Sequence, residues 1–156
     1  MKLEGTAQLN GTPDALFGRL LDPETLQRCI KGCESLEELP DQDEDTRGYA
    51  AAVKVGIGAI KGRFKATVSL SDIDAPTSYA MSIAAKSPVG HLRGTAQIEL
   101  ATNDAGTSLT WSADAKVSGV IAAVGQRLIG AAAQKFADDF FNRLQDVVGG
   151  PDSGQS

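Results

Sequence analysis

Residues 49–70 read YAAAVKVGIGAIKGRFKATVSL, and the spacing of their apolar side chains decides the fold class. Apolar residues occupy alternate positions on both sides of the glycine-rich centre GIGAIKG, residues 56–62. A period of two residues is typical of strands that bury one face, and a short break with glycine between two such runs predicts an antiparallel hairpin. GIGAIKG lacks the spacing of a phosphate-binding loop and precedes a strand pattern, so we interpret it as the turn of this hairpin.

The same alternation continues on both sides of the hairpin. It recurs at residues 79–85, 92–100 and 109–117, with turn-forming residues between these runs, and it also appears at residues 3–9. Together with a further segment near residues 34–39, these runs predict about seven strands. Strands that follow one another through short turns form an antiparallel meander, so we expect one curved antiparallel sheet.

Helical patterns flank the strands. Thr12 and Pro13 predict an N-cap followed by the first residue of a helix, and a second short helix is expected at residues 23–30. Over residues 119–148 apolar side chains recur every four residues, which predicts one long amphipathic helix. An α+β fold follows, in which the curved sheet wraps around the C-terminal helix.

Composition and charge exclude several classes of function. The 156-residue chain has the size of one domain, which we expect over residues 1–148, followed by a flexible polar tail at 149–156. The net charge of -5 argues against nucleic acid as a partner, because phosphate binding depends on clustered lysine and arginine. No apolar run reaches the ~20 residues that cross a bilayer, and the first residues do not resemble a signal peptide, so a cytoplasmic location is predicted. The acidic run 41–45 is interpreted as a solvated turn.

The only cysteines, Cys29 and Cys33, flank the end of the second short helix. The only histidine is His91, and these three residues lack the paired spacing that structural zinc sites show. The C-x3-C spacing also differs from the C-x-x-C pattern of redox thiols. We therefore predict buried structural thiols, no metal site and no cofactor.

The inward positions of the predicted strands carry no histidine and no charged side chain. Acid–base and nucleophilic catalysis need titratable or activated groups inside a pocket, so a binding protein is favoured over an enzyme. Small residues, including Gly125 and Gly130, fill the first half of the long helix, which indicates either close packing on the sheet or room for a ligand. The predicted apolar cavity is lined by Val53, Phe64, Met81, Ile98, Trp111, Ile121, Gly125 and Leu128.

Basic side chains gather on the outward positions of the strands, at Lys54, Lys61, Arg63, Lys65, Lys86 and Arg93. Two interpretations stay open. The cluster is either an ordinary solvated sheet face or a docking surface for an acidic partner or anionic lipid head groups. The predicted partner or membrane surface consists of Lys54, Lys61, Arg63 and Lys65.

Five short motifs in the sequence resemble those of a known family. In chain order they are Asp22-Pro23-Glu24, Cys29-Ile30-Lys31-Gly32-Cys33-Glu34, Val53-Lys54-Val55-Gly56-Ile57-Gly58, Lys61-Gly62-Arg63-Phe64 and Leu70-Ser71-Asp72. With these motifs, residues 1–148 resemble the CoxG family of carbon monoxide dehydrogenase subunits, which is part of the START-like, or SRPBCC, superfamily. Lys31 stands where this family usually has proline. The resemblance implies a helix-grip fold of the START and Bet v 1 type.

The resemblance also implies a function. It suggests an accessory protein of CO dehydrogenase-type molybdenum hydroxylases, associated with recruiting the enzyme to the membrane or with handling its quinone acceptor. We therefore expect a non-enzymatic protein with a quinone- or lipid-like ligand, a molybdenum hydroxylase as partner and peripheral contact with the inner membrane. Two alternatives remain, a START-like aromatase or cyclase acting on a hydrophobic substrate and a structural adaptor without a ligand.

Overall fold

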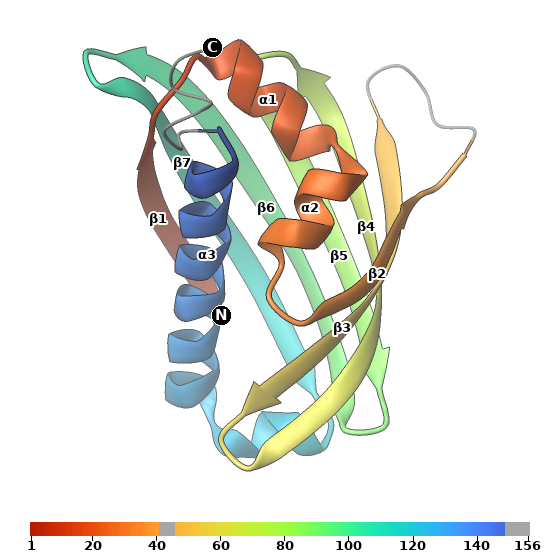
Figure 1. Ribbon diagram of the computed structural model, residues 1–156. Coiled ribbons are helices and arrows are strands. Elements are labelled where there is room, and N and C mark those ends of the chain that lie inside the picture. Colours follow the sequence, from red (N-terminus) through yellow and green to blue (C-terminus); the bar gives the residue numbers. More distant parts are fainter. Residues whose placement is uncertain (41–45, 149–156) are drawn as a thin grey trace.

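The computed structural model describes residues 1–40 and 46–148 (Figure 1). The predicted acidic turn at 41–45 and the predicted polar tail at 149–156 lie outside the described residues. The strands are β1 (Lys2–Leu9), β2 (Cys33–Glu38), β3 (Arg47–Ile57), β4 (Ile60–Asp74), β5 (Ser78–Ser87), β6 (Gly90–Asn103) and β7 (Gly106–Ser118). The helices are α1 (Pro13–Leu21), α2 (Pro23–Cys29), the 3-10 helix η1 (Val120–Val124) and α3 (Gln126–Val148).

The strands form one antiparallel sheet in the order β1-β7-β6-β5-β4-β3-β2. The first strand therefore pairs with the last one, which brings Gly5 opposite Trp111. Figure 1 shows the sheet curving around α3, while α1 and α2 lie across its upper part. This architecture confirms the predicted α+β helix-grip fold with a curved antiparallel sheet and a C-terminal helix.

Side-chain caps fix the two short helices where the sequence predicts them. Thr12 Oγ1 accepts a hydrogen bond from the Ala15 amide at 3.2 Å, and Pro13 is the first residue of α1. Asp22 Oδ2 accepts from the Thr25 amide at 3.1 Å and from the Thr25 hydroxyl at 2.7 Å at the start of α2. The hydrogen bonds from Thr25 are the main reason that the pKa of Asp22 is lowered. Asp22 is also the C-cap of α1, so one residue joins the two helices.

The C-terminal helix begins later than predicted. The helix expected from residue 119 is wrong over its first residues, since Val120–Val124 form η1 and α3 starts at Gln126. Gly125 separates the two with a φ of 96°, a left-handed conformation that an α-helix does not accept. The Ile121 amide also donates to the Val89 carbonyl at 2.8 Å, so η1 is tied to the turn between β5 and β6. Gly125 is therefore a hinge before the helix and not one of its interior residues.

The apolar stripe predicted for α3, which includes Leu128, Ile129, Phe136 and Leu144, is buried only in part. Leu128 and Phe136 are 43% and 40% exposed, whereas Ile129 and Leu144 are buried. A residue series with a spacing of four advances about 40° around a helix at each step, because one turn takes 3.6 residues. Residues four apart in the predicted stripe therefore do not all lie on the inner side of α3, whereas Ile129, which the prediction placed beside Leu128, does.

The main hydrophobic core lies at the end of the sheet that α1 and α2 cover. Leu16, Phe17 and Leu144 are buried there against inward residues of the strands, and the rings of Phe17 and Tyr79 meet edge to face at 5.6 Å. The Tyr49 hydroxyl donates to the Leu21 carbonyl at 2.6 Å, which joins β3 to the last turn of α1. This end of the space between helix and sheet is closed by packed side chains.

Candidate functional site

The inner face of the sheet is apolar, as the alternation predicts. Tyr49, Val53 and Phe64 are buried on this face, while Lys54 and Lys65 on the alternate positions are exposed. His91 is also exposed, in agreement with its predicted outward position. The inner face therefore offers van der Waals surface and few polar groups to anything bound against it.

A band of small residues crosses the middle of this inner face. The register aligns Ala51, Ala66 and Ala85 on three neighbouring strands, and the adjacent rows add Gly94, Ala96, Ala113 and Ala115. All these residues are only partly buried, so they are not covered by tightly packed side chains. The corresponding part of α3 also has small residues, at Gly130, Ala132 and Ala133. The middle of the inner face and the first half of α3 thus both carry small side chains.

The path of α3 agrees with this interpretation. Its Cα atoms come within 8 Å of the sheet chiefly at β1 and β3, which lie near opposite edges of the strand order. The helix thus bridges the two sides of the curved sheet and passes over the middle strands at a greater distance. The inward side chains Ile83, Leu92 and Val117 on those middle strands remain partly exposed.

A second group of buried side chains lies at the other end of the space. Val53 and Phe64 are direct neighbours in the register and are 9% and 6% exposed, and Ile121 and Ile129 are buried as well. These four residues do not belong to the main core cluster. The apolar inner face therefore has a packed group at each end and partly exposed residues between them.

The predicted cavity residues divide between these regions. Val53, Phe64 and Ile121 belong to the second group, while Ile98 is part of the main core. Met81 and Trp111 are partly buried at the border of that core, where the Trp111 ring would collide with any Cβ placed on Gly5. Five of these six residues therefore lie on the inner face, toward the two ends of the alanine band, and Ile121 lies on η1.

Leu128 and Gly125 are placed differently from the prediction. Leu128 is largely exposed and lies against the β3–β4 turn, where its Cδ2 would be 3.2 Å from a Cβ on Gly58. Gly125 precedes α3, and a side chain there would meet nothing within 4 Å but would be strained by the positive φ. Leu128 is therefore a rim residue between α3 and the hairpin tip. The alanine band is the feature that sequence reasoning missed, because it appears only once the strands are in register.

Two tyrosines bring hydroxyl groups to the inner face. Burial raises the pKa of Tyr49 to about 12, and burial also raises the pKa of Tyr79 far above its usual value. Both phenols are therefore protonated at neutral pH and act as hydrogen-bond donors rather than bases.

The Tyr79 hydroxyl is the less constrained of the two. The side chain is 6% exposed, and its hydroxyl makes no hydrogen bond within the described part of the chain. Among the described residues, Gln145 Nε2 is the one side-chain polar atom that is both unpaired and fully enclosed, so the Tyr79 oxygen keeps a small contact with open space. A largely buried donor without a protein partner is unfavourable, so the Tyr79 hydroxyl has an unused hydrogen bond.

The cysteines form part of a turn that is bonded to β3. The Lys54 amide donates to the Gly32 carbonyl at 2.9 Å, and a side chain at Gly32 would collide with the Lys54 carbonyl. Cys29 is fully buried as predicted, whereas Cys33 is only partly buried and lies opposite Val53. Burial raises the pKa of both thiols, which disfavours the reactive thiolate. Over residues 1–40 and 46–148, no three His, Cys, Asp or Glu side chains gather as a metal site would require.

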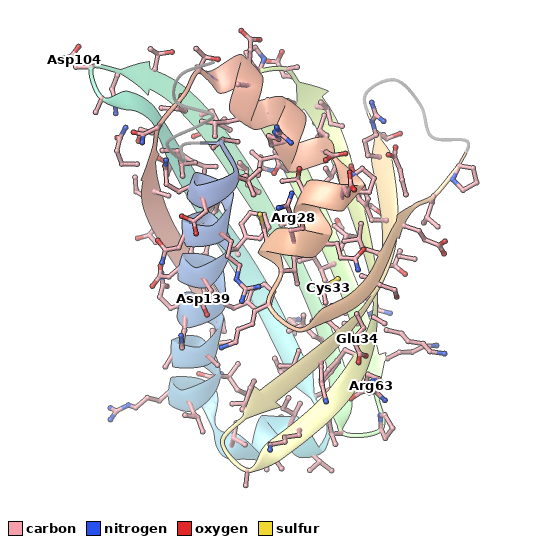
Figure 2. The ribbon with its side chains drawn as sticks, viewed as in Figure 1. Arg28, Cys33, Glu34, Arg63, Asp104 and Asp139 are labelled. Atoms are coloured by element: carbon pink, nitrogen blue, oxygen red, sulfur yellow. The ribbon has the colours of Figure 1, made fainter. Side chains whose placement is uncertain are left out.

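The predicted basic residues all lie on the outer face. Lys54, Lys61, Arg63 and Lys65 are exposed, and Arg63 forms a two-pronged ion pair with Glu34 at 2.7 and 3.2 Å. Figure 2 shows Glu34 and Arg63 close together near the lower edge of the sheet, with Cys33 above them. None of the described helices combines the length and the apolarity that a bilayer crossing needs.

Comparisons with known proteins agree with this arrangement. Residues 5–149 match the CoxG family of carbon monoxide dehydrogenase subunits. No curated protein matches the sequence. A conserved protein from Geobacillus kaustophilus is 35% identical, with a TM-score of 0.84 over 94% of this chain and 93% of that chain.

More distant structures share the fold alone. A protein from Thermus thermophilus has 16% identity and a TM-score of 0.70, over 94% of this chain and 95% of that one. Ara h 8.0201 has 16% identity and a TM-score of 0.68, over 94% of this chain and 96% of that one. Because the family match spans most of the sequence and a 35% identical structure has the same fold, the chain belongs to the CoxG family of carbon monoxide dehydrogenase subunits.

Proposed function

We propose that this protein is a non-enzymatic accessory protein that holds a quinone- or lipid-like molecule between α3 and the alanine band of the sheet. In this role it assists a CO dehydrogenase-type molybdenum hydroxylase, by handling its quinone or by bringing it to the inner membrane, where the protein makes peripheral contact. The family membership supports the accessory role. The band formed by Ala51, Ala66 and Ala85 carries the ligand proposal, because it is the apolar surface that α3 leaves partly uncovered.

The chemistry of the inner face favours an apolar ligand with few polar atoms. A ligand that removes roughly 600 Å² of apolar surface from water, counted over both molecules, gains about 15 kcal/mol. Association costs of several kcal/mol then leave an affinity near the micromolar range. The Tyr79 hydroxyl supplies a donor for one carbonyl oxygen, which suits a quinone ring better than a pure hydrocarbon.

The test is to fill the space and measure binding. Trp111 is the only tryptophan, so quenching of its fluorescence by a menaquinone analogue reports a ligand on the inner face. Ala85→Leu adds apolar volume to the alanine band, while Ser82→Leu on the outer face of the same strand is the matched control. We expect saturable quenching in the native protein and in Ser82→Leu, and loss of quenching in Ala85→Leu without a lower melting temperature.

Either of two results contradicts the proposal. Filling a packed core causes strain of typically 1 to 3 kcal/mol, so an Ala85→Leu variant that melts much earlier would indicate that no free space exists. Absence of saturable quenching in the native protein would favour the structural adaptor instead.

A further inference from the structure

The outer face of the sheet has a hollow of about 840 Å³ that crosses five strands from β2 to β6. Its floor comes from short outward residues such as Ala50, Ala52 and Ala84, which are direct or diagonal neighbours in the register. Most of the strand residues that line it are outward, so the hollow opens on the side of the sheet opposite α3. The inward residues Ala51, Ala66, Ala85 and Leu92 also line it. It shares Ala51, Ala66 and Ala85 with the ligand site proposed above, but the side chains of these three residues point to the other face.

Basic side chains lie next to one another at one end of this hollow. Lys65 lies directly opposite Lys86, and Lys86 lies directly opposite His91 on the next strand. Arg93 lines the same hollow one row away. Like charges opposite each other destabilise a sheet, and no ion pair found in the described residues includes Lys65, Lys86 or Arg93. An anion bound between them would remove this repulsion.

The two ends of the hollow carry opposite charges. Glu34 and Glu37 line the β2 end, where Glu34 already pairs with Arg63, and the cations line the β4–β6 end. The remaining outward positions of the middle strands are mostly neutral, as at Ser82 and Thr95, and the whole chain carries a charge of -5. The basic end is therefore a local feature and not a consequence of overall composition.

From this geometry we propose that the hollow binds an extended acidic segment of a partner protein. Four strand spacings of ~4.8 Å give a trench of about 19 Å, which accommodates five or six extended residues. A flat bilayer surface cannot enter a concave trench, whereas a peptide chain can place carboxylates between Lys65, Lys86 and Arg93. The inference deepens the proposed accessory role and rests on it, because it identifies the surface and the partner chemistry that this role needs.

The experiment uses a fluorescein-labelled peptide with the sequence GTSEAE, whose two glutamates lie at one end, so that they reach the basic end of the hollow while its neutral end lies near Glu34 and Glu37. Anisotropy should show saturable binding that weakens as salt is added. The Lys65→Glu/Lys86→Glu variant should lose at least tenfold in affinity. The Lys2→Glu/Arg127→Glu variant has the same change in net charge on exposed residues outside the hollow, and it should stay within about threefold of the native protein.

Further measurements separate this proposal from its rivals. Amide NMR shifts on adding peptide should concentrate at Ala52, Thr67 and Ala84, and both double variants should keep the native melting temperature and native menaquinone quenching. The proposal is overturned if the peptide does not bind, if both double variants lose affinity equally, or if the shifts lie elsewhere. It is also overturned if phosphatidylglycerol vesicles, and not the peptide, bind in a manner that depends on Lys65 and Lys86. Absence of quenching in the native protein would contradict only the ligand proposal.

Discussion

The two buried tyrosines differ in the hydrogen bonding of their hydroxyl groups, so replacing each with phenylalanine gives a matched pair of variants. The Tyr49 hydroxyl donates to the Leu21 carbonyl at 2.6 Å, while the Tyr79 hydroxyl makes no hydrogen bond within the described residues. The last carbonyls of a helix have no partner inside the helix, so Tyr49 provides one for α1. Tyr49→Phe should therefore lower the free energy of unfolding by about 1 to 2 kcal/mol, because it removes a hydrogen bond and leaves a carbonyl unpaired.

Tyr79→Phe should behave oppositely. The substitution keeps the edge-to-face contact with Phe17 and removes a largely buried hydroxyl that has no protein partner, so the free energy of unfolding should be unchanged or higher. If the hydroxyl donates to a quinone carbonyl, its loss should weaken the ligand by the value of one hydrogen bond, roughly 2- to 12-fold. Guanidinium unfolding at constant m-value gives the first quantity, and titration of Trp111 fluorescence gives the second.

The stability prediction and the affinity prediction for Tyr79→Phe can each be contradicted separately. If Tyr79→Phe costs as much stability as Tyr49→Phe, the Tyr79 hydroxyl has a protein partner and is not available to a ligand. If stability is unchanged but the menaquinone affinity is also unchanged, the hydroxyl does not contact the ligand and the polar anchor lies elsewhere.

Two further predictions concern titratable groups. Tyr49 and Tyr79 are the only tyrosines, and burial raises their pKa values above the unfolded value of about 10. Their contribution to the free energy of unfolding is therefore complete below about pH 10 and is lost as the pH rises further. In a pH titration, tyrosinate absorbance should appear together with unfolding, and a normal titration near pH 10 in the folded protein would contradict their burial. Asp22→Ala should cost about 1 kcal/mol in thermal unfolding by removing the cap of α2, while Asp22→Asn keeps that cap. Because the pKa of Asp22 is lowered, the advantage of the native protein over the Asp22→Asn variant should disappear as the pH falls through that pKa, and an advantage that persists in acid would contradict the charge-based reasoning.

Much of the fold could be predicted because its local signals are strong. Alternating apolar residues located the strands, and Thr12 followed by Pro13 marked the start of α1 through a side-chain cap that is observed. The cap that Asp22 provides for α2 was not predicted. The start of the C-terminal helix could not be predicted in this way. In the sequence, Gly125 is compatible with the four-residue spacing of a helix, as any small residue is. The structure shows that the Ile121 amide bonds to the β5–β6 turn and that Gly125 has a positive φ, so the helix begins only after Gly125.

The two candidate sites depend on strand register, which the sequence does not display. Between Ser71 and Asp74 the β4–β5 ladder shifts by one residue, and Asp72 has a φ of 51° at this irregularity. Extending the Asp74–Ser78 pairing without the shift would place Lys65 opposite Ser87, whereas the observed partner is Lys86. A shift of one residue changes which side chains are cross-strand neighbours on the same face. Neither the alanine band nor the pairing of Lys65 with Lys86 could therefore be predicted from the sequence positions alone.

The same row of residues separates the two sites. The methyl groups of Ala51, Ala66 and Ala85 point toward α3, and the backbone of these residues lies behind the outer hollow, which they also line. A ligand on the inner face and a peptide on the outer face would thus be one sheet layer apart. Successive side chains of a strand point to opposite faces, so the side chain added by Ala85→Leu lies on the inner face and the one changed by Lys86→Glu lies on the outer face. Any effect of either substitution on the other site must therefore pass through the hydrogen-bonded backbone, and its size measures how strongly ligand and partner are coupled.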